Sequence, residues 1–234
     1  MKKINKDVIT KKSLLGNNWS IKKTEERLVL SIAQKNNISF LLSKLLITRN
    51  IESDSVLDFL NSNIHFNIPN PFKISDMQIS VERVFKALKN NDKIGIIADY
   101  DVDGSTSAAL LFKFLRNFTK NIILKTPNRL SEGYGPNLRI MDELLNENVN
   151  LIFTLDCGTS SKNIIDNKKY INIDVIVIDH HLGENLKPNV FSIINPNKDN
   201  ENSEFNNLAA VGVTFLFLMA LRKFLREKNF FSDS

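Results

Sequence analysis

Three aspartates, Asp99, Asp101 and Asp103, occupy alternate positions directly after a short apolar run. If the backbone stays extended there, alternate side chains project to the same side, so the three carboxylates would face one another. Like charges at such close range raise each other's pKa unless a positive group lies between them. Hard oxygen ligands select Mg²⁺ or Mn²⁺, so this spacing predicts a site for divalent cations.

Two alternatives for this acidic segment are a calcium-binding EF-hand loop and a plain polar turn. An EF-hand loop needs a glutamate at its twelfth position and a helix on each side. Counting from Asp99, the twelfth residue is Leu110, and the preceding run is typical of a strand, so the EF-hand is excluded. The polar turn stays open. Gly104 permits a sharp turn, and the hydroxyl residues 105–107 are expected to cap a helix whose N-terminus favours phosphate.

Two further apolar runs end in residues that could bind metal. The run 151–155 leads into Asp156, and the run 175–178 leads into Asp179, His180 and His181. Neutral imidazole is the commonest metal ligand, and a neighbouring carboxylate can fix its tautomer. Two of the chain's three histidines therefore stand together at the end of one expected strand.

The elements that would position these residues follow from the pattern after residue 93. Short β-branched runs predict strands at 94–98, 121–125, 151–155, 175–178 and 191–194, with helices near 105–118, 137–147 and 160–169 between the first four. Nearly continuous apolar strands that alternate with helices predict an α/β fold, a mostly parallel sheet with helices on both faces. Ligands of such sheets lie beyond the carboxyl ends of the strands, which is where all three motifs fall.

One pocket is therefore expected to collect the metal-ligating groups from three strand ends, with His181 beside them: Asp99, Asp101, Asp103, Asp156 and His180. Such a set suits two cations roughly 3.5–4 Å apart, which can activate a water and stabilise both oxygens of an in-line displacement at phosphorus. A dinucleotide-binding fold is disfavoured, because no GxGxxG motif follows the first strand.

The chain before this region divides into two parts. Residues 1–23 hold seven lysines and are expected to form a basic flexible arm. Residues 24–91 form a small helical leader, with helices capped by Thr24 and Ser39, a short helix at 53–60 and another opened by Ser75. The α/β catalytic domain is expected to span 92–234.

The composition fits a globular, cytoplasmic protein. The net charge of +5 suits a polyanionic partner without requiring one, and the single cysteine, Cys157, excludes an intramolecular disulfide. The longest nearly apolar run, 208–221, is too short to span a membrane and suits a buried helix, so no membrane partner is expected. The N-terminal residues carry no apolar stretch that would make a secretory signal.

Taken together, the motifs resemble those of the DHH phosphoesterase superfamily, named for a triplet like Asp179-His180-His181. Within it, the chain is most similar to the RecJ family of single-strand-specific DNA exonucleases. The segments that carry this likeness fall in the family's order at 98–107, 127–135, 154–158, 194–197 and 208–213. Trp19, Pro71 and Asp76-Met77 also resemble the segment before that family's core, so the likeness covers nearly the whole chain.

The resemblance implies a divalent-metal exonuclease that degrades single-stranded DNA from the 5′ end in repair and recombination. It implies that two divalent ions, Mn²⁺ or Mg²⁺, are held by or near the five residues named above. It also implies that four residues act in catalysis: Asp101, Asp103, His180 and His181. His181 would face the scissile phosphate. A single-strand-binding protein or a helicase partner is implied by the family alone.

Three residues are expected to contact DNA: Arg129, Ser105 and Thr106. The guanidinium of Arg129 suits a DNA phosphate, with a surface salt bridge as the alternative. Tyr134 is expected to pack between Gly133 and Gly135 rather than to act in the site.

In the family, a helix like 208–226 is followed by a strand with a further metal-binding aspartate and then by two more domains. The given chain is therefore expected to be a fragment or a truncated or split gene product. Two other functions stay open. One is a DHH phosphodiesterase for short oligonucleotides or cyclic dinucleotides, against which the helical leader argues. The other is an inactive scaffold, against which the intact Asp101, Asp103, Asp156 and His180 argue.

Overall fold

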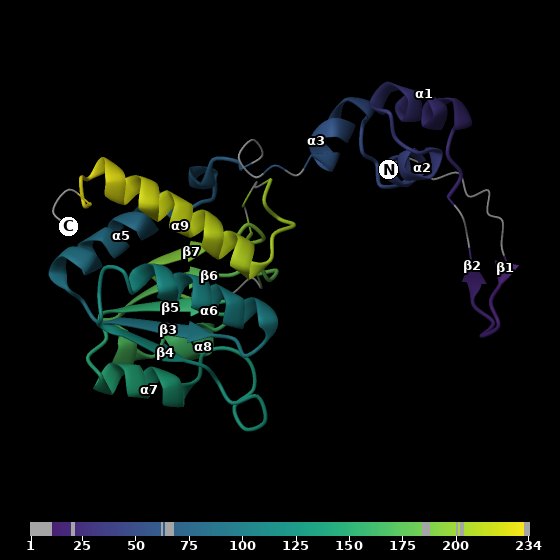
Figure 1. Cartoon of the computed structure of the whole chain (residues 1–234). Helices are drawn as coiled ribbons and strands as arrows, with labels where there is room; N and C mark the ends of the chain where they lie inside the picture. The colour runs from purple at the N-terminus through teal and green to yellow at the C-terminus, as the bar shows by residue number, and fades with distance from the viewer. Residues whose placement is uncertain are drawn as a thin grey trace. The chain divides into compact units, whose positions relative to one another are not determined.

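The structure, a computed structural model, divides the chain into two compact units, Met1–Pro69 and Asn70–Ser234 (Figure 1). The residues that it describes are 11–19, 22–61, 63, 68–183, 188–199, 201 and 204–231.

The smaller unit contains a short antiparallel hairpin and a group of helices. The hairpin pairs β1 (Lys11–Lys12) with β2 (Asn18–Trp19), within a segment for which the sequence predicted no regular structure. The helical elements are α1 (Glu26–Asn36), α2 (Phe40–Thr48), η1 (Ser53–Ser55) and α3 (Val56–Leu60). They bury a small apolar core around Ile32, Leu46 and Val56.

One of the two expected helix caps in this unit is confirmed. The hydroxyl of Ser39 accepts a hydrogen bond from the backbone N–H of Leu42 at 3.2 Å and so caps α2. The expected cap at Thr24 is wrong, because α1 begins at Glu26 and Glu25 occupies the N-cap position without a side-chain hydrogen bond.

The larger unit is built on a five-stranded sheet in which every neighbouring pair is parallel, in the order β4-β3-β5-β6-β7. Its strands are β3 (Ile94–Ala98), β4 (Ile122–Lys125), β5 (Leu151–Leu155), β6 (Asp174–Ile178) and β7 (Ser192–Ile194). Every residue of β3 and β5 is buried, as their continuous apolar runs require in a sheet covered on both faces. The predicted strands and the α/β fold class are confirmed.

Helices cover both faces of this sheet (Figure 1). One face carries α5 (Met77–Asn90), α6 (Val102–Leu115) and α9 (Ala210–Glu227), and the other carries α7 (Leu138–Asn146), α8 (Lys162–Ile165) and η3 (Lys168–Tyr170). A short turn, η2 (Pro71–Lys73), precedes α5. On the first face, the ring centroids of Phe153 and Phe217 lie 5.8 Å apart. On the second face, Met141 and Leu144 are buried against the strands.

The boundary between the units lies earlier than the sequence predicted. The helix expected to close the leader, α5, begins at Met77 and belongs to the larger unit. Its Ser80 hydroxyl hydrogen-bonds to that of Ser192 at 2.7 Å, and its Phe85 ring lies 5.7 Å from that of Phe224. The periodicity of an amphipathic helix shows that one face is buried but does not show against which element.

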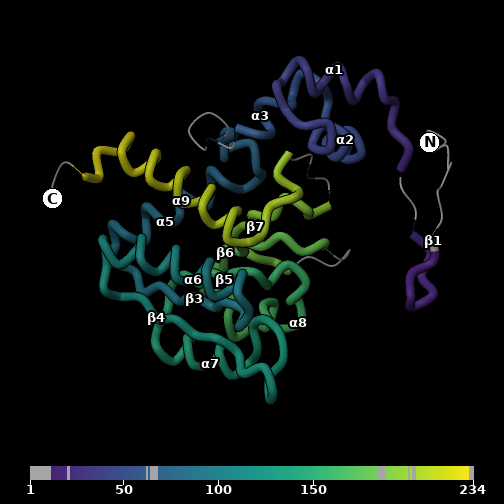
Figure 2. Tube along the Cα trace, turned by 45° about the vertical axis from the view of Figure 1, so that its right-hand side comes forward, coloured from purple at the N-terminus to yellow at the C-terminus, as the bar shows by residue number. Residues whose placement is uncertain are grey.

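The strand order determines where a ligand can lie. The chain leaves β3 for β4 on one side and then passes to β5 on the other side of β3. At such a reversal the loops after neighbouring strands diverge and leave a crevice beyond their carboxyl ends. The tube in Figure 2 follows this path, with β3, β5 and β6 side by side in the sheet. Their carboxyl ends carry all three predicted motifs.

Gly104 has a strict steric role in this arrangement. A Cβ added there would lie 2.5 Å from the backbone oxygen of Asp99, which is too close for any real contact. We expect Gly104→Ala to destabilise the chain by about 1–3 kcal/mol in chemical denaturation, because backbone must move to relieve the overlap. Gly183→Ala is the control, since its Cβ would make an ordinary 3.5 Å contact. Equal stability of the two variants would contradict this account.

Candidate metal centre

The backbone of the acidic segment is extended at Asp101 and helical from Val102, so the condition that all three aspartates lie on extended chain is not met at Asp103. Asp101 is the N-cap of α6, and its carboxylate accepts a hydrogen bond from the N–H of Gly104 at 2.9 Å. Aspartate is among the best N-cap residues, so the helix begins before the hydroxyl residues that were expected to cap it. Thr106 instead lies within the helix and donates back to the carbonyl oxygen of Val102 at 2.7 Å.

Asp103 links the start of α6 to the start of α9. Its two carboxylate oxygens accept hydrogen bonds from the N–H groups of Ala210 and Val211, each at 2.7 Å. Ala209, at the N-cap of α9, offers no side-chain cap, so the carboxylate of Asp103 satisfies amides that would otherwise lack partners. A negative charge also opposes the positive end of the helix dipole. Asp103 therefore has a structural role as well as a place in the site.

Two aspartates are buried at the centre of the site. Asp99 is 3% exposed and Asp156 is 1% exposed. With Asp101 they form a group whose carboxylate oxygens lie within 4.8 Å of one another. The backbone of Asp156 has a φ of 59°, in the left-handed region that aspartate tolerates better than most residues. In the part of the chain that the structure describes, Oδ1 of each buried aspartate has no hydrogen-bond partner.

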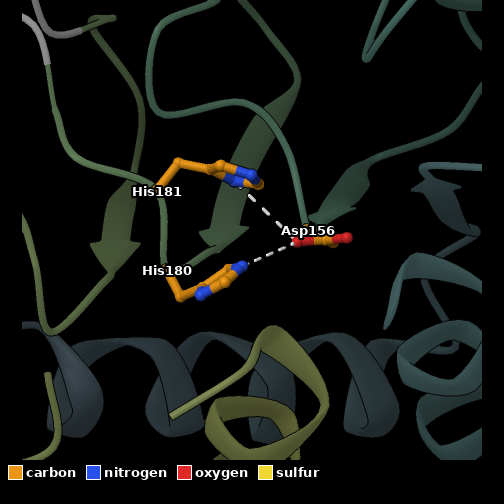
Figure 3. A group of neighbouring side chains, drawn as sticks. All are labelled: Asp156, His180 and His181. Atoms are coloured by element: carbon orange, nitrogen blue, oxygen red, sulfur yellow. Dashed lines mark ion pairs between the residues drawn. The ribbon is translucent and has the colours of Figure 1, made fainter. Parts of the chain in front are cut away.

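Two imidazoles face the same carboxylate from the end of β6 (Figure 3). Nε2 of His180 lies 3.4 Å from Oδ1 of Asp156 and 3.6 Å from Oδ2 of Asp103. Nδ1 of His181 lies 3.8 Å from the same Oδ1 of Asp156. The three strand ends therefore bring together all five predicted ligand residues and His181.

Among the residues that the structure describes, no lysine or arginine side chain forms an ion pair with the carboxylates of this cluster. Burial, followed by repulsion from Asp103 and Asp101, raises the pKa of Asp156 to about 8. Burial also raises the pKa of Asp99. Buried carboxylate oxygens without hydrogen bonds, surrounded by other carboxylates and two imidazoles, form a donor set that fits divalent cations. A cation there would compensate both the repulsion and the lost hydration.

Asp179 supports the histidines. It is 1% exposed and accepts hydrogen bonds from the N–H of Thr159 and from Nδ1 of His181, the latter at 2.7 Å. Although burial opposes its ionisation, these hydrogen bonds hold the pKa of Asp179 below its ordinary value. The same hydrogen bond raises the pKa of His181. A carboxylate acceptor at Nδ1 leaves Nε2 of His181 as the nitrogen that remains for a ligand or substrate.

Two asparagines hold the backbone of the histidine pair, and reasoning from single residues missed both. The amide of Asn195 donates to the carbonyl oxygen of His181 at 2.9 Å, and that of Asn197 donates to the carbonyl oxygen of His180 at 2.6 Å. Asn195 also donates to the hydroxyl of Thr159 at 3.0 Å. The only sequence signal was the family-like segment 194–197, which gave these side chains no role.

Tyr134 belongs to the site, so the expectation that it packs between two glycines is wrong. Its hydroxyl donates to the carbonyl oxygen of Asp156 at 2.6 Å and lies 3.2 Å from Nδ1 of His181. The two rings meet edge to face, with centroids 5.7 Å apart. Burial, with nearby carboxylates, raises the pKa of Tyr134, so its hydroxyl keeps its proton.

The residues expected to contact DNA lie at the surface. Arg129 is exposed, and its guanidinium lies 5.3 Å from the centre of the Tyr100 ring. No ion pair of Arg129 occurs among the described residues, so the surface salt bridge considered for it is not formed there. Ser105 and Thr106 are exposed in the first turns of α6, beside the acidic cluster in sequence.

Comparison with known families agrees with this geometry. The model of the DHH family, N-terminal domain, matches residues 93–232. The chain belongs to the DHH family. The matched region contains every strand of the large sheet and every residue of the acidic and histidine cluster.

Individual relatives are exonucleases of the RecJ type. The chain is 36% identical to the single-stranded-DNA-specific exonuclease RecJ of Escherichia coli (strain K12) over 162 residues, 69% of this chain and 28% of that protein. It is 30% identical to the Bacillus subtilis (strain 168) RecJ over 204 residues, 87% of this chain and 26% of that protein. The chain thus spans about a quarter of the length of these relatives.

A solved structure of exonuclease RecJ bound to manganese is 28% identical to the chain, with a TM-score of 0.59, and the match covers 68% of this chain and 39% of that one. The predicted resemblance is therefore confirmed, and the family model concerns the N-terminal domain of the DHH family. Within the described residues, the structure contains no helix with both the length and the apolar character needed to cross a bilayer.

The raised pKa values at the site predict a pH dependence of stability. Between its ordinary value of 3.8 and about 8, Asp156 binds its proton more tightly in the folded than in the unfolded chain. Stability in chelator should therefore fall as the pH rises through this window. The raised pKa values of Asp99 and His181 act in the same direction.

We expect the Tm in chelator to be lower at pH 8 than at pH 5, and Mn²⁺ to raise it more at pH 8, because protons and cations compete for the same oxygens. Asp156→Asn should flatten the pH dependence, whereas Asp58→Asn, at an exposed position in α3, should preserve it. A Tm that stays level or rises between pH 5 and pH 8 in chelator would show that the cluster is not electrostatically stressed.

Proposed function

We propose that the chain is the catalytic part of a metal-dependent exonuclease that hydrolyses phosphodiester bonds in single-stranded DNA from the 5′ end, in DNA repair and recombination. The observation that carries the proposal is the cluster in which buried oxygens of Asp99 and Asp156 lack hydrogen bonds and face His180 and His181. Similarity to RecJ exonucleases over most of the chain supports single-stranded DNA as the substrate.

The five predicted ligand residues would hold two ions, Mn²⁺ or Mg²⁺, and the manganese-bound RecJ structure gives a precedent for a divalent metal in this family. Bound there, two cations would supply an activated water and neutralise charge on the phosphate. The side chains have their own tasks. Asp103 keeps α9 against the cluster, and Asp179 orients His181 so that Nε2 can donate to or stabilise the reacting phosphate.

Three exposed residues are assigned to the DNA strand. Arg129 is free of ion pairs among the described residues, and its planar guanidinium suits a backbone phosphate. Ser105, in the first turn of α6, would donate its hydroxyl to a neighbouring phosphate, and Thr106 would do so in place of its hydrogen bond to the Val102 carbonyl oxygen. A single-strand-binding protein or a helicase is the expected partner of the whole enzyme, and the cytoplasm is its expected compartment.

Hydrolysis of a 5′-labelled single-stranded oligonucleotide in Mn²⁺ tests this function. We expect nucleotides to be released from the labelled single strand faster than from the corresponding duplex. We also expect Asp101→Ala and His180→Ala to lower the rate at least a thousandfold, because both remove groups at the reacting centre. Thermal melts should show that both variants remain folded.

Asp58→Ala, at an exposed position outside the site, is the matched control and should keep the full rate. Preference for a dinucleotide over the long strand would favour the phosphodiesterase alternative. Absence of metal-dependent cleavage on both substrates would favour the inactive scaffold. Either result would overturn the exonuclease assignment, as would full cleavage by both site variants.

A further inference from the structure

A pocket of about 510 Å³ lies directly beside the acidic and histidine cluster. It shares His181 and the buried Asp179 with the cluster. Its remaining walls come from the loop before α7, from the segment after β5 and from α8 itself, including Tyr134, Pro136, Ser160, Ser161 and Asn163. Its volume lies within the range of about 300–1,000 Å³ typical of small-molecule sites.

The lining of this pocket is unsuited to a phosphate. Its described lining residues include no lysine or arginine, and the one carboxylate among them, that of Asp179, is already engaged by hydrogen bonds from the backbone and His181. An anion entering it would meet His181 as the one basic side chain among the described lining residues, and that imidazole also borders the cluster. The negative part of a substrate is therefore better accommodated at a cation-loaded cluster than in the pocket.

The same lining suits a neutral, flat and polar group. Pro136 and Ile164 contribute apolar surface, and the ring of Tyr134, which is 51% exposed, borders the pocket. Around these surfaces stand polar groups that can both donate and accept. Within the described part of the chain, the side chains of Ser160, Ser161 and Asn163 make no hydrogen bonds, so they are free to pair with a ligand. Apolar faces edged with adaptable hydrogen-bonding groups match the chemistry of a nucleobase and its sugar.

Tyr134 joins the pocket to the cluster. Its hydroxyl is fixed by the carbonyl oxygen of Asp156 and lies against His181, while its ring borders the pocket. A nucleotide with its phosphate at the cluster would therefore have its nucleoside within reach of the pocket. We propose that this pocket binds the base and sugar of the nucleotide whose phosphate lies at the metal cluster. The inference rests on the proposed function and adds a nucleoside subsite to it.

The proposal predicts that the base itself contributes to affinity. Stacking on an aromatic side chain is worth about 1–3 kcal/mol per base, which corresponds to at least about a fivefold difference in Kd. We expect the chain in Mn²⁺ to bind deoxyadenosine monophosphate about tenfold more tightly than deoxyribose 5-phosphate in calorimetric titrations. The two probes share the phosphate and the sugar, so the difference measures the base.

Two substitutions that fill the pocket, Asn163→Trp and Ser160→Trp, should reduce this preference to about one. Both positions are exposed, so a larger side chain there does not disturb the core. Asn146→Trp is the matched control, because Asn146 is an exposed asparagine that ends helix α7 outside the pocket. The control should keep the preference, and all three variants should bind Mn²⁺ as the unchanged chain does.

The outcomes separate this inference from the proposed function. Cleavage of single-stranded DNA without any preference for the nucleotide, or with a preference that survives both pocket substitutions, would overturn the nucleoside subsite and leave the exonuclease assignment standing. A preference that only the pocket substitutions abolish, in a chain that cleaves no DNA, would overturn the exonuclease assignment and leave the subsite.

Discussion

Confinement of negative charge in a poorly hydrated space is the constraint on which this site depends. Asp99 and Asp156 are buried at the ends of adjacent strands, and Asp101 and Asp103 lie beside them. Burial and mutual repulsion both oppose ionisation there, as the raised pKa of Asp156 shows. The carboxylates cannot move apart, because the parallel strands hold their carboxyl ends together at one edge of the sheet. The unfavourable electrostatics and the capacity to bind cations have the same origin.

The residues that shape the site also hold the domain together. The carboxylate of Asp103 joins the beginnings of α6 and α9, helices that pack side by side over the sheet. Asn195 and Asn197 fix the backbone of the histidine pair to the segment that follows β7. Such hydrogen bonds to buried groups leave unsatisfied partners when broken. A substitution at these positions therefore changes both stability and the geometry of the histidines.

The site is asymmetric, and that asymmetry bears on substrate binding. The cluster offers oxygens and imidazoles for cations, whereas the adjoining pocket offers neutral polar groups around the ring of Tyr134. A nucleotide has a matching division, with a charged phosphate and a neutral nucleoside. The chain spans about a quarter of the length of its RecJ relatives, and this pairing of cluster and pocket lies entirely within that quarter.

The sequence by itself determined the five parallel strands, the fold class and the acidic and histidine residues that meet at the strand ends, because continuous β-branched runs and the residues at their ends are local patterns. Only the tertiary structure decided how those residues are used. Asp103 pairs with α9 across 107 positions, and Tyr134 reaches His181 across 47. The tertiary structure also assigned α5 to the larger unit. Periodicity reveals that a face is buried, whereas its partner depends on how the whole chain packs.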